Sequence, residues 1–234
     1  MAVTFKNPAD AVTEQGAKVL AYGASSTGKT TLCATAGVPT CLISAEAGLL
    51  SIRNAPNTVQ IVEVHSVQDV QDVFNYLKKE GPPPWVCLDS VSELAELCLA
   101  EERQKVKNKL QAYGEMADIM EGLIKGFRDL PNTNVLFTAK QARNKDDANG
   151  TLIYEPGTPG QKLGAALPYY FDLVLAARVF KNDDGTIEHW LQTQRDEQYE
   201  AKDRSGLLDM FEKPNLAALE KKISGAKSTT RKAA

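Results

Sequence analysis

The sequence predicts an α/β fold with a mostly parallel central sheet, helices on both of its faces and a C-terminal antiparallel hairpin. From Lys18 to Ala139, apolar strand-like runs alternate with helix-like segments, a pattern that favours parallel strands joined by helical crossovers. After Phe171, two strand-like runs flank the turn-forming sequence at 182–185, which favours a hairpin. With 234 residues, 43% of them hydrophobic, the chain can bury one sizeable core.

Five apolar runs in the first part of the chain predict the parallel strands. They cover residues 18–23, 40–45, 59–64, 85–89 and 134–139. The helices expected between them cover residues 29–36, 67–80, 91–109 and 115–130. Ser66 and Asp69 match a capping box that opens the second helix, and the three prolines at 82–84 prevent it from continuing.

The pattern changes after Lys140. A polar stretch with several Gly and Pro residues runs from 140 to 164, and its length predicts a functional or mobile loop. The hairpin follows over residues 171–180 and 186–194, and then a last short helix over 214–223. We therefore predict a polar N-terminal arm over 1–15, one core over 16–223 and a disordered basic tail over 224–234.

The composition limits the classes of function. A net charge of −3 and a pI near 5.6 give no global basic field, so binding to nucleic acid would need a local basic surface. Cys33, Cys41, Cys87 and Cys98 lack the spacing of a metal site and suit buried thiols in a reducing cytosol. Because no signal peptide or membrane-length apolar run is found, we expect a soluble cytoplasmic protein without a membrane partner.

A complete phosphate-loop pattern, Gly-x-x-x-x-Gly-Lys-Thr, occupies residues 23–30 between a predicted strand and a predicted helix. In such a loop the backbone amides surround the phosphates, Lys29 reaches the β- and γ-phosphate oxygens and the Thr30 hydroxyl coordinates Mg²⁺. The sequence therefore predicts ATP and Mg²⁺ as ligands. The predicted nucleotide-binding residues are Gly23, Ala24, Ser25, Ser26, Thr27, Gly28, Lys29, Thr30, Thr31 and Asp89.

Two acidic residues at predicted strand ends complete the expected site. Asp89 ends the strand at 85–89 and suits a metal-binding carboxylate that acts partly through water. Hydrolysis also needs a base for the attacking water, and Ser90 stands where many such ATPases carry that glutamate. The best candidate for the base is Glu46, which follows the strand at 40–45.

Several segments resemble the RecA-type recombinases. CLISAEAGLLSI at 41–52 is similar to the segment in which one of their strands ends with the catalytic glutamate, and VCLDSVSEL at 86–94 resembles their metal-binding segment. VLFTAKQARNK at 135–145 resembles the strand that ends in a γ-phosphate sensor, which maps onto Gln141, with Lys140 as the alternative. AKDRSG at 201–206 resembles a motif of hexameric helicases in which Lys202 and Arg204 would reach the ATP site of a neighbouring subunit.

Over residues 18–223 the chain resembles short phage-encoded RecA-core ATPases, the phage nucleotide-binding proteins and single-strand annealing recombinases. The resemblance implies a RecA-like ATPase, stimulated by single-stranded DNA, in a bacterial host cell. It also implies a homo-oligomer, as a ring or a filament, and a single-strand-binding protein as a further candidate partner. The expected DNA contacts lie around the 140–164 loop: Lys140, Arg143, Lys145, Tyr154 and Lys162.

Three other functions remain open at this point. A hexameric helicase-like motor would share the same site, and a nucleotide-holding adaptor would bind ATP without hydrolysis. A small-molecule kinase would need an arginine-rich lid, whereas Arg143, Arg178, Arg195 and Arg204 are scattered. Arg204 also has an alternative to a role in a neighbour's ATP site. Residues 194–204 are rich in charge, so this segment could simply be a solvated surface.

Overall fold

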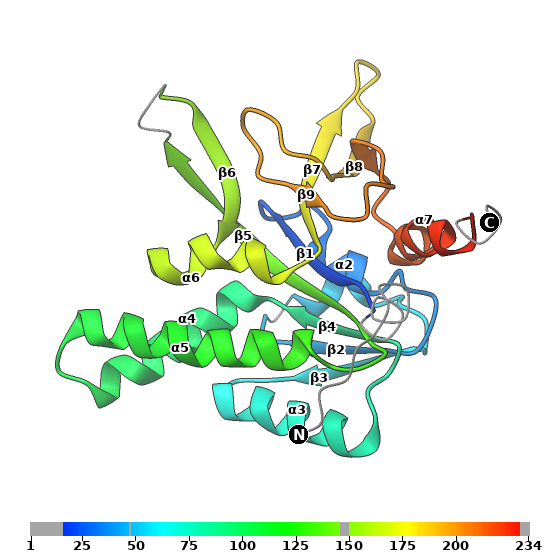
Figure 1. The fold of residues 1–234 in the computed structure, drawn as a ribbon. Helices are drawn as coiled ribbons and strands as arrows, with labels where there is room; N and C mark the ends of the chain where they lie inside the picture. Colours follow the sequence, from blue (N-terminus) through cyan, green and yellow to red (C-terminus); the bar gives the residue numbers. More distant parts are fainter. Residues whose placement is uncertain (1–15, 47, 146–149, 230–234) are drawn as a thin grey trace.

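The computed structural model describes the backbone of residues 16–46, 48–145 and 150–229 (Figure 1). The predicted arm at 1–15 and the last residues of the predicted tail, 230–234, lie outside the described residues. The described chain forms one continuous ten-stranded sheet. The predicted α/β class, with a mostly parallel sheet and a C-terminal antiparallel hairpin, is confirmed.

The strands of the sheet follow the order β10-β8-β7-β1-β5-β4-β2-β3, with β6 beside β5 and β9 beside β7. The neighbours from β7 to β3 run parallel, while β7–β8, β8–β10, β5–β6 and β7–β9 are antiparallel. The bounds are β1 Lys18–Gly23, β2 Thr40–Ser44, β3 Val59–Glu63, β4 Trp85–Asp89, β5 Asn134–Lys145, β6 Leu152–Gly157, β7 Leu173–Lys181, β8 Ile187–Gln192, β9 Lys202–Asp203 and β10 Phe211–Glu212.

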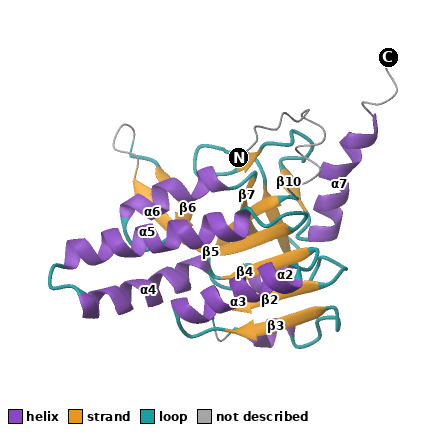
Figure 2. Ribbon diagram, turned by 60° about the horizontal axis from the view of Figure 1, so that its bottom comes forward, coloured by secondary structure: helices purple, strands orange, loops and turns teal. Residues whose placement is uncertain are grey.

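The helices cover both faces of the sheet (Figures 1 and 2). Their bounds are α2 Lys29–Cys33, η1 Leu49–Ile52, α3 Val67–Glu80, α4 Val91–Lys105, α5 Lys109–Arg128, α6 Gln161–Ala166, η2 Leu167–Tyr170 and α7 Leu216–Thr229. Because side chains alternate along a strand, β1 contributes to both cores. Leu20 and Tyr22 pack with α3, α4 and α5, whereas Val19 and Ala21 pack with α2 and α7.

The predicted elements occur in the predicted order. Some of their boundaries differ from the prediction, because capping side chains determine where a helix begins. Ser66 accepts a hydrogen bond from the Asp69 amide at 3.1 Å and so begins α3, as expected. α5 begins at Lys109 rather than at residue 115, because the Asn108 side chain accepts a hydrogen bond from the Leu110 amide. α7 continues to Thr229, so part of the predicted disordered tail is helical.

The largest difference concerns the stretch at 140–164, which we expected to be a loop. β5 continues to Lys145 and pairs with β6, so the polar stretch forms a β-hairpin that projects from the sheet and is followed by α6 (Figure 1). Residues 146–149 of the hairpin lie outside the described residues.

The four cysteines are free and buried, as expected from their apolar surroundings. Burial raises the pKa of Cys41 to about 11 and that of Cys98 to about 12. Within the described residues no group of three or more His, Cys, Asp or Glu side chains is placed to hold a metal ion. No helix in the described part of the chain has the length and apolar character needed to cross a bilayer.

Candidate nucleotide-binding site

The phosphate loop connects the end of β1 to the start of α2. A Cβ atom on Gly23 would lie 2.7 Å from Thr27 Oγ1 and 2.8 Å from the Ala177 carbonyl oxygen, so only glycine fits there. Gly28 has a φ of +89°, a conformation that glycine adopts without strain. Thr27 is buried and donates to the Ala24 carbonyl at 2.9 Å, so its side chain stabilises the loop from within.

Lys29 Nζ lies at the mouth of this loop. It donates to the carbonyl oxygens of Gly23 at 2.9 Å and Ala24 at 2.8 Å, two acceptors that hold it over the loop. Burial lowers the pKa of the Lys29 ammonium, and the charges of Glu46 and Asp89 oppose that shift. A half-buried cation of this kind favours an anionic ligand.

Asp89 connects the phosphate loop to the centre of the sheet. It is 2% exposed, and one of its carboxylate oxygens accepts a hydrogen bond from Thr30 Oγ1 at 2.6 Å. Thr138, on the neighbouring strand β5, donates to the other oxygen. The hydroxyl of Thr30 and the carboxylate of Asp89 are hard oxygen ligands side by side, which is the chemistry that Mg²⁺ prefers.

Glu46 follows β2, whose last residue, Ser44, pairs with Asp89. The Ala45 amide donates to the Asp89 carbonyl at 2.8 Å, which holds the two strand ends together. Ser90 Oγ donates to the Glu46 carboxylate and also accepts from the Glu93 amide at 3.2 Å, capping α4. From the sequence, Ser90 or Ser92 was expected as a cap of this helix, and Ser90 is the residue that caps it. Its contact with Glu46 was not predicted.

A cavity of about 580 Å³ joins these groups. Eleven of its lining residues were predicted as site residues from the sequence: eight lie in the phosphate loop or directly after it, and the others are Glu46, Lys140 and Gln141. The remaining two are Ser51 in η1 and Gly48, which precedes η1. The lining is Gly23, Ala24, Ser25, Ser26, Gly28, Lys29, Thr30, Thr31, Glu46, Gly48, Ser51, Lys140 and Gln141. The structure therefore brings the phosphate loop, the candidate base and both candidate sensors around one space.

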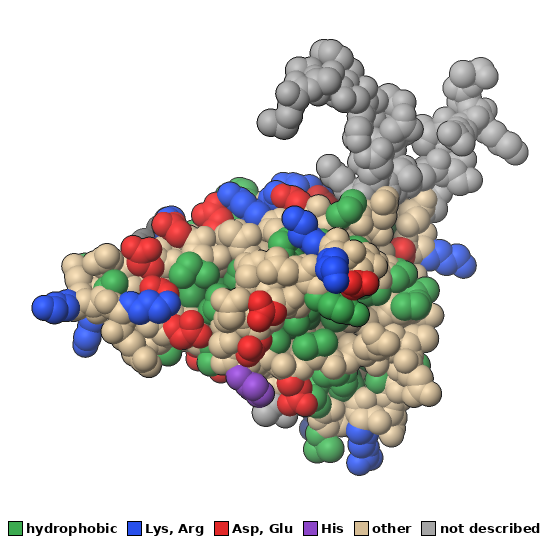
Figure 3. Space-filling view, turned by 90° about the horizontal axis from the view of Figure 1, so that it is seen from below, with side chains coloured by type: hydrophobic (Ala, Val, Ile, Leu, Met, Phe, Trp, Pro, Cys, Tyr) green, Lys and Arg blue, Asp and Glu red, His purple; other side chains and the backbone are tan. Residues whose placement is uncertain are grey.

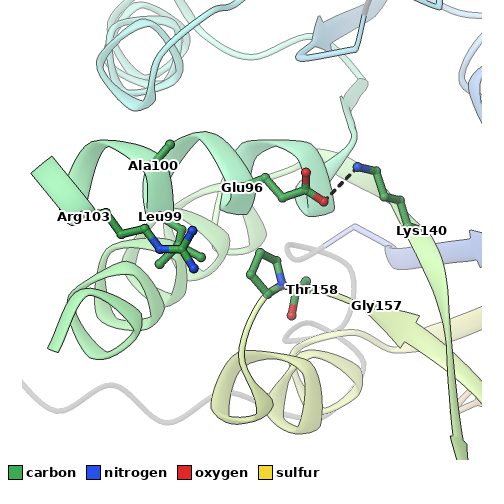
Figure 4. Close-up of a pocket in the computed structure, with 8 residues that line it drawn as sticks. Glu96, Leu99, Ala100, Arg103, Lys140, Gly157 and Thr158 are labelled. Carbon is green, nitrogen blue, oxygen red and sulfur yellow. Dashed lines mark hydrogen bonds and ion pairs between the residues drawn. The ribbon is translucent and has the colours of Figure 1, made fainter. Parts of the chain in front are cut away.

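Lys140 and Gln141 differ in their other contacts. Lys140 Nζ donates to Glu93 at 2.7 Å and to Glu96 at 2.9 Å, both on α4. Although burial lowers it, the pKa of Lys140 is raised by these two hydrogen bonds. Lys140 also borders a second cavity, between α4 and the end of β6 (Figure 4). Its ammonium is thus already neutralised by α4.

Lys202 and Arg204 lie at the opposite end of the parallel strands from the phosphate loop. Arg204 Nη1 contacts Asp172 at 3.3 Å, and the Asp172 amide donates to the carbonyl of Lys18, the first residue of β1. A six-residue strand such as β1 spans roughly 17–20 Å. Lys202 Nζ donates to the Pro168 carbonyl at 2.5 Å. Neither side chain reaches the phosphate loop of its own chain.

The predicted DNA contacts divide into two groups. Arg143 and Lys145 are exposed on the β5–β6 hairpin. Lys162 instead pairs with Asp118 at 2.6 Å, and Lys140 pairs with α4 as described. Figure 3 shows acidic and basic side chains interspersed on the face seen from below, so no field of one sign covers that face.

Tyr154, expected as a base-stacking group, is occupied within the chain. Its ring stacks on Tyr199 with centroids 4.7 Å apart, and the Arg143 guanidinium lies 5.7 Å from the Tyr154 centroid. The buried Tyr22 Oη lies 2.8 Å from the carbonyl oxygens of both Tyr154 and Glu200, toward which it donates. These contacts fix the base of the hairpin against the segment that precedes β9.

Two residues near the loop were missed by the sequence analysis. Thr138 is a polar residue inside the otherwise apolar stretch 135–139 of β5, and that interruption could have indicated its contact with Asp89. His189, on β8, has its Nδ1 3.2 Å from the Thr27 carbonyl oxygen. No local pattern signals that contact, because the two residues are 162 positions apart.

The fold and this cavity define a nucleotide-binding P-loop ATPase. The family model described as "AAA domain" matches residues 15–205, and the chain belongs to that family. Among solved structures, a KaiC-like protein from the hyperthermophilic archaeon Pyrococcus horikoshii OT3 is similar. It is 13% identical, with 76% of this chain and 77% of that chain covered and a TM-score of 0.46. No curated protein matches the sequence.

Proposed function

We propose that the protein hydrolyses ATP in a site completed by a second copy of the chain, and that it binds single-stranded DNA through the β5–β6 hairpin in recombination or strand annealing. One observation carries the hydrolytic part. Lys29, Thr30 and Glu46 line one cavity, and the buried Asp89 is hydrogen-bonded to Thr30 beside it, although these four residues come from three separate strand ends.

Each group has a distinct task in the proposed reaction. The loop amides and Lys29 bind the β- and γ-phosphates, so Lys29 exchanges its two carbonyl acceptors for phosphate oxygens. Thr30 and Asp89 would hold Mg²⁺, which neutralises phosphate charge when bound. The Glu46 carboxylate accepts a proton from the water that attacks the γ-phosphorus, and the bond to the β-phosphate oxygen breaks.

The proposed contribution of a neighbour rests on charge and position. Phosphoryl transfer develops negative charge that a further cation stabilises, and Lys140 is already paired with Glu93 and Glu96. Arg204 has a planar guanidinium suited to this task, its side chain is 54% exposed, and it lies at the far end of the strands. A second copy would bring that end toward the first copy's cavity.

The proposed DNA contact rests on the projecting hairpin. Arg143 and Lys145 are exposed on it, and cations on such a surface bind phosphates without reading sequence. Because Tyr154 stacks on Tyr199, we assign the contact to the two cations rather than to base stacking. The alternative functions are distinguished by chemistry: an adaptor would bind ATP without turnover, and a motor would translocate along the strand.

The decisive experiment measures ATP affinity and phosphate release, each with and without single-stranded DNA. Lys29→Ala should abolish binding. Glu46→Gln should retain binding and lower turnover by roughly 100-fold or more, the usual contribution of a general base. Glu63→Gln is the matched control, because Glu63 ends the adjacent strand β3 and is exposed. If Glu46→Gln turned over ATP like the wild type, Glu46 would be excluded as the base, and ATP binding without turnover in the wild type would favour the adaptor.

A further inference from the structure

The β7–β8 hairpin lies directly beside the phosphate loop. His189 Nδ1 is 3.2 Å from the Thr27 carbonyl oxygen, and a Cβ on Gly28 would lie 3.7 Å from the same nitrogen. We propose that the base of the bound nucleotide packs on the face of this hairpin formed by Val179, Ile187 and His189. This inference rests on the proposed binding of ATP at the loop.

The direction of the nucleotide follows from the sheet order. Asp89 and Glu46 lie at the ends of β4 and β2, on the β5 side of β1. From β1 to β2 the sheet crosses three strand positions, about 14 Å. The γ-phosphate must point that way, because the candidate base and the metal-binding carboxylate are there. The nucleoside therefore leaves the loop on the other side of β1, where β7 and β8 lie.

The register of β7 and β8 shows which side chains would contact the nucleoside there. Ala177 pairs with Leu191 and Val179 with His189, so these four side chains share one face. Ala177 and Leu191 are buried in the core beside α2. Beyond them the same face leaves the core: Val179 is 43% exposed, and Ile187, which pairs with Lys181 two positions further along, is 64% exposed. An apolar surface thus begins where the phosphate loop ends.

The chemistry of this surface fits a flat aromatic ring. Two β-branched aliphatic side chains offer an apolar face for a base, and the His189 imidazole lies between that face and the loop. Aliphatic side chains carry no donors or acceptors that would identify one base. A hydrophobic surface of this kind rejects isosteres only weakly, so the ligand class is nucleoside triphosphates in general, with purines favoured by their larger area.

The test compares two ligands that share phosphates and differ in the base. In Ile187→Thr and Val179→Thr the β-branched shape and strand propensity are kept while apolar area is lost. Calorimetry with Mg²⁺-ATP should show Kd rising roughly three- to tenfold for each variant. Affinity for Mg²⁺-tripolyphosphate, which has no base, should stay at the wild-type value. Ile61→Thr, an exposed strand isoleucine on the distant β3, is the control and should change neither affinity.

Three results separate this inference from the proposed function. Unchanged ATP affinity in both hairpin variants would overturn the inference while leaving ATP binding intact. Weaker ATP binding in Leu50→Ser, on η1 at the other side of the cavity, with the hairpin variants unaffected, would also overturn it. Wild-type protein that bound neither ATP nor tripolyphosphate would instead refute the proposed function itself.

Discussion

The hydroxyl group of Ser90 forms hydrogen bonds with two neighbours. Its Oγ accepts a hydrogen bond from the Glu93 amide at the start of α4 and donates one to the Glu46 carboxylate. Ser90 is fully buried, so its hydroxyl has little freedom to choose other partners. It therefore acts as a positioning residue that orients the candidate base toward the cavity, while the cap fixes its own backbone.

Removing that hydroxyl should slow turnover without weakening ATP binding. In Ser90→Gly we expect kcat to fall by about tenfold or more, because a misplaced base loses its alignment with the water. Glycine is the informative change, since it costs an N-cap only a few tenths of a kcal/mol. Ser90→Thr keeps a hydroxyl and should retain most of the activity. The measurements are steady-state phosphate release and the Kd for ATP.

Ser66 provides the matched control. It caps α3 with the same geometry, accepting a hydrogen bond from the Asp69 amide, and it is not among the residues that line the cavity. Ser66→Gly should leave kcat at the wild-type value. If the two glycine variants behaved alike, Ser90 would be a helix cap and nothing more.

The β5–β6 hairpin shows why the sequence predicts some elements and not others. The buried half of β5 is an apolar run that only Thr138 interrupts over residues 135–139, so it was predicted. The polar half pairs with β6, and β6 is held by two further backbone hydrogen bonds: the Tyr154 amide donates to the Gln198 carbonyl, and the Glu200 amide donates to the Tyr154 carbonyl. These partners lie more than forty residues away in the chain, and no local pattern contains them. The phosphate loop was predicted in full because all of its information is local.

Charge removal on the hairpin tests its proposed contact with DNA. In the double variant Arg143→Ala, Lys145→Ala, the affinity for single-stranded DNA should fall, because two phosphate contacts are lost. The slope of log K against log salt should decrease by about 1.4, at about 0.7 for each contact with a single strand. Lys162→Ala is the control, since Asp118 already neutralises this lysine. An unchanged slope in the double variant would assign the DNA contact to another surface.

At the scale of the whole molecule, the cavity and Arg204 lie at opposite ends of the same strands. The sequence motif around Lys202 and Arg204 could not reveal this arrangement, because the position of these residues depends on the pairing of β9 with the start of β7. Two copies arranged head to tail would bring the ends together, and such heterologous contacts generate rings or filaments.

Mixing two inactive variants tests that arrangement. Arg204→Ala and Glu46→Gln should each bind ATP and hydrolyse it very slowly. In an equimolar mixture, a Glu46 site of one variant can receive Arg204 from the other, so activity should recover to about a quarter of wild type if subunits combine at random. The measurement is phosphate release after subunit exchange. Wild-type turnover in Arg204→Ala alone would remove this arginine from the reaction.

Tyr22 contacts two separate parts of the chain through one atom. The residue lies one position before the phosphate loop, and its phenol oxygen contacts a carbonyl of β6 and a carbonyl of the segment that leads to Lys202 and Arg204. If nucleotide binding shifted the end of β1, this one atom would transmit the shift to the hairpin that we propose binds DNA and to the segment before Arg204. Strand engagement and subunit cooperation would then respond to ATP as one event rather than two.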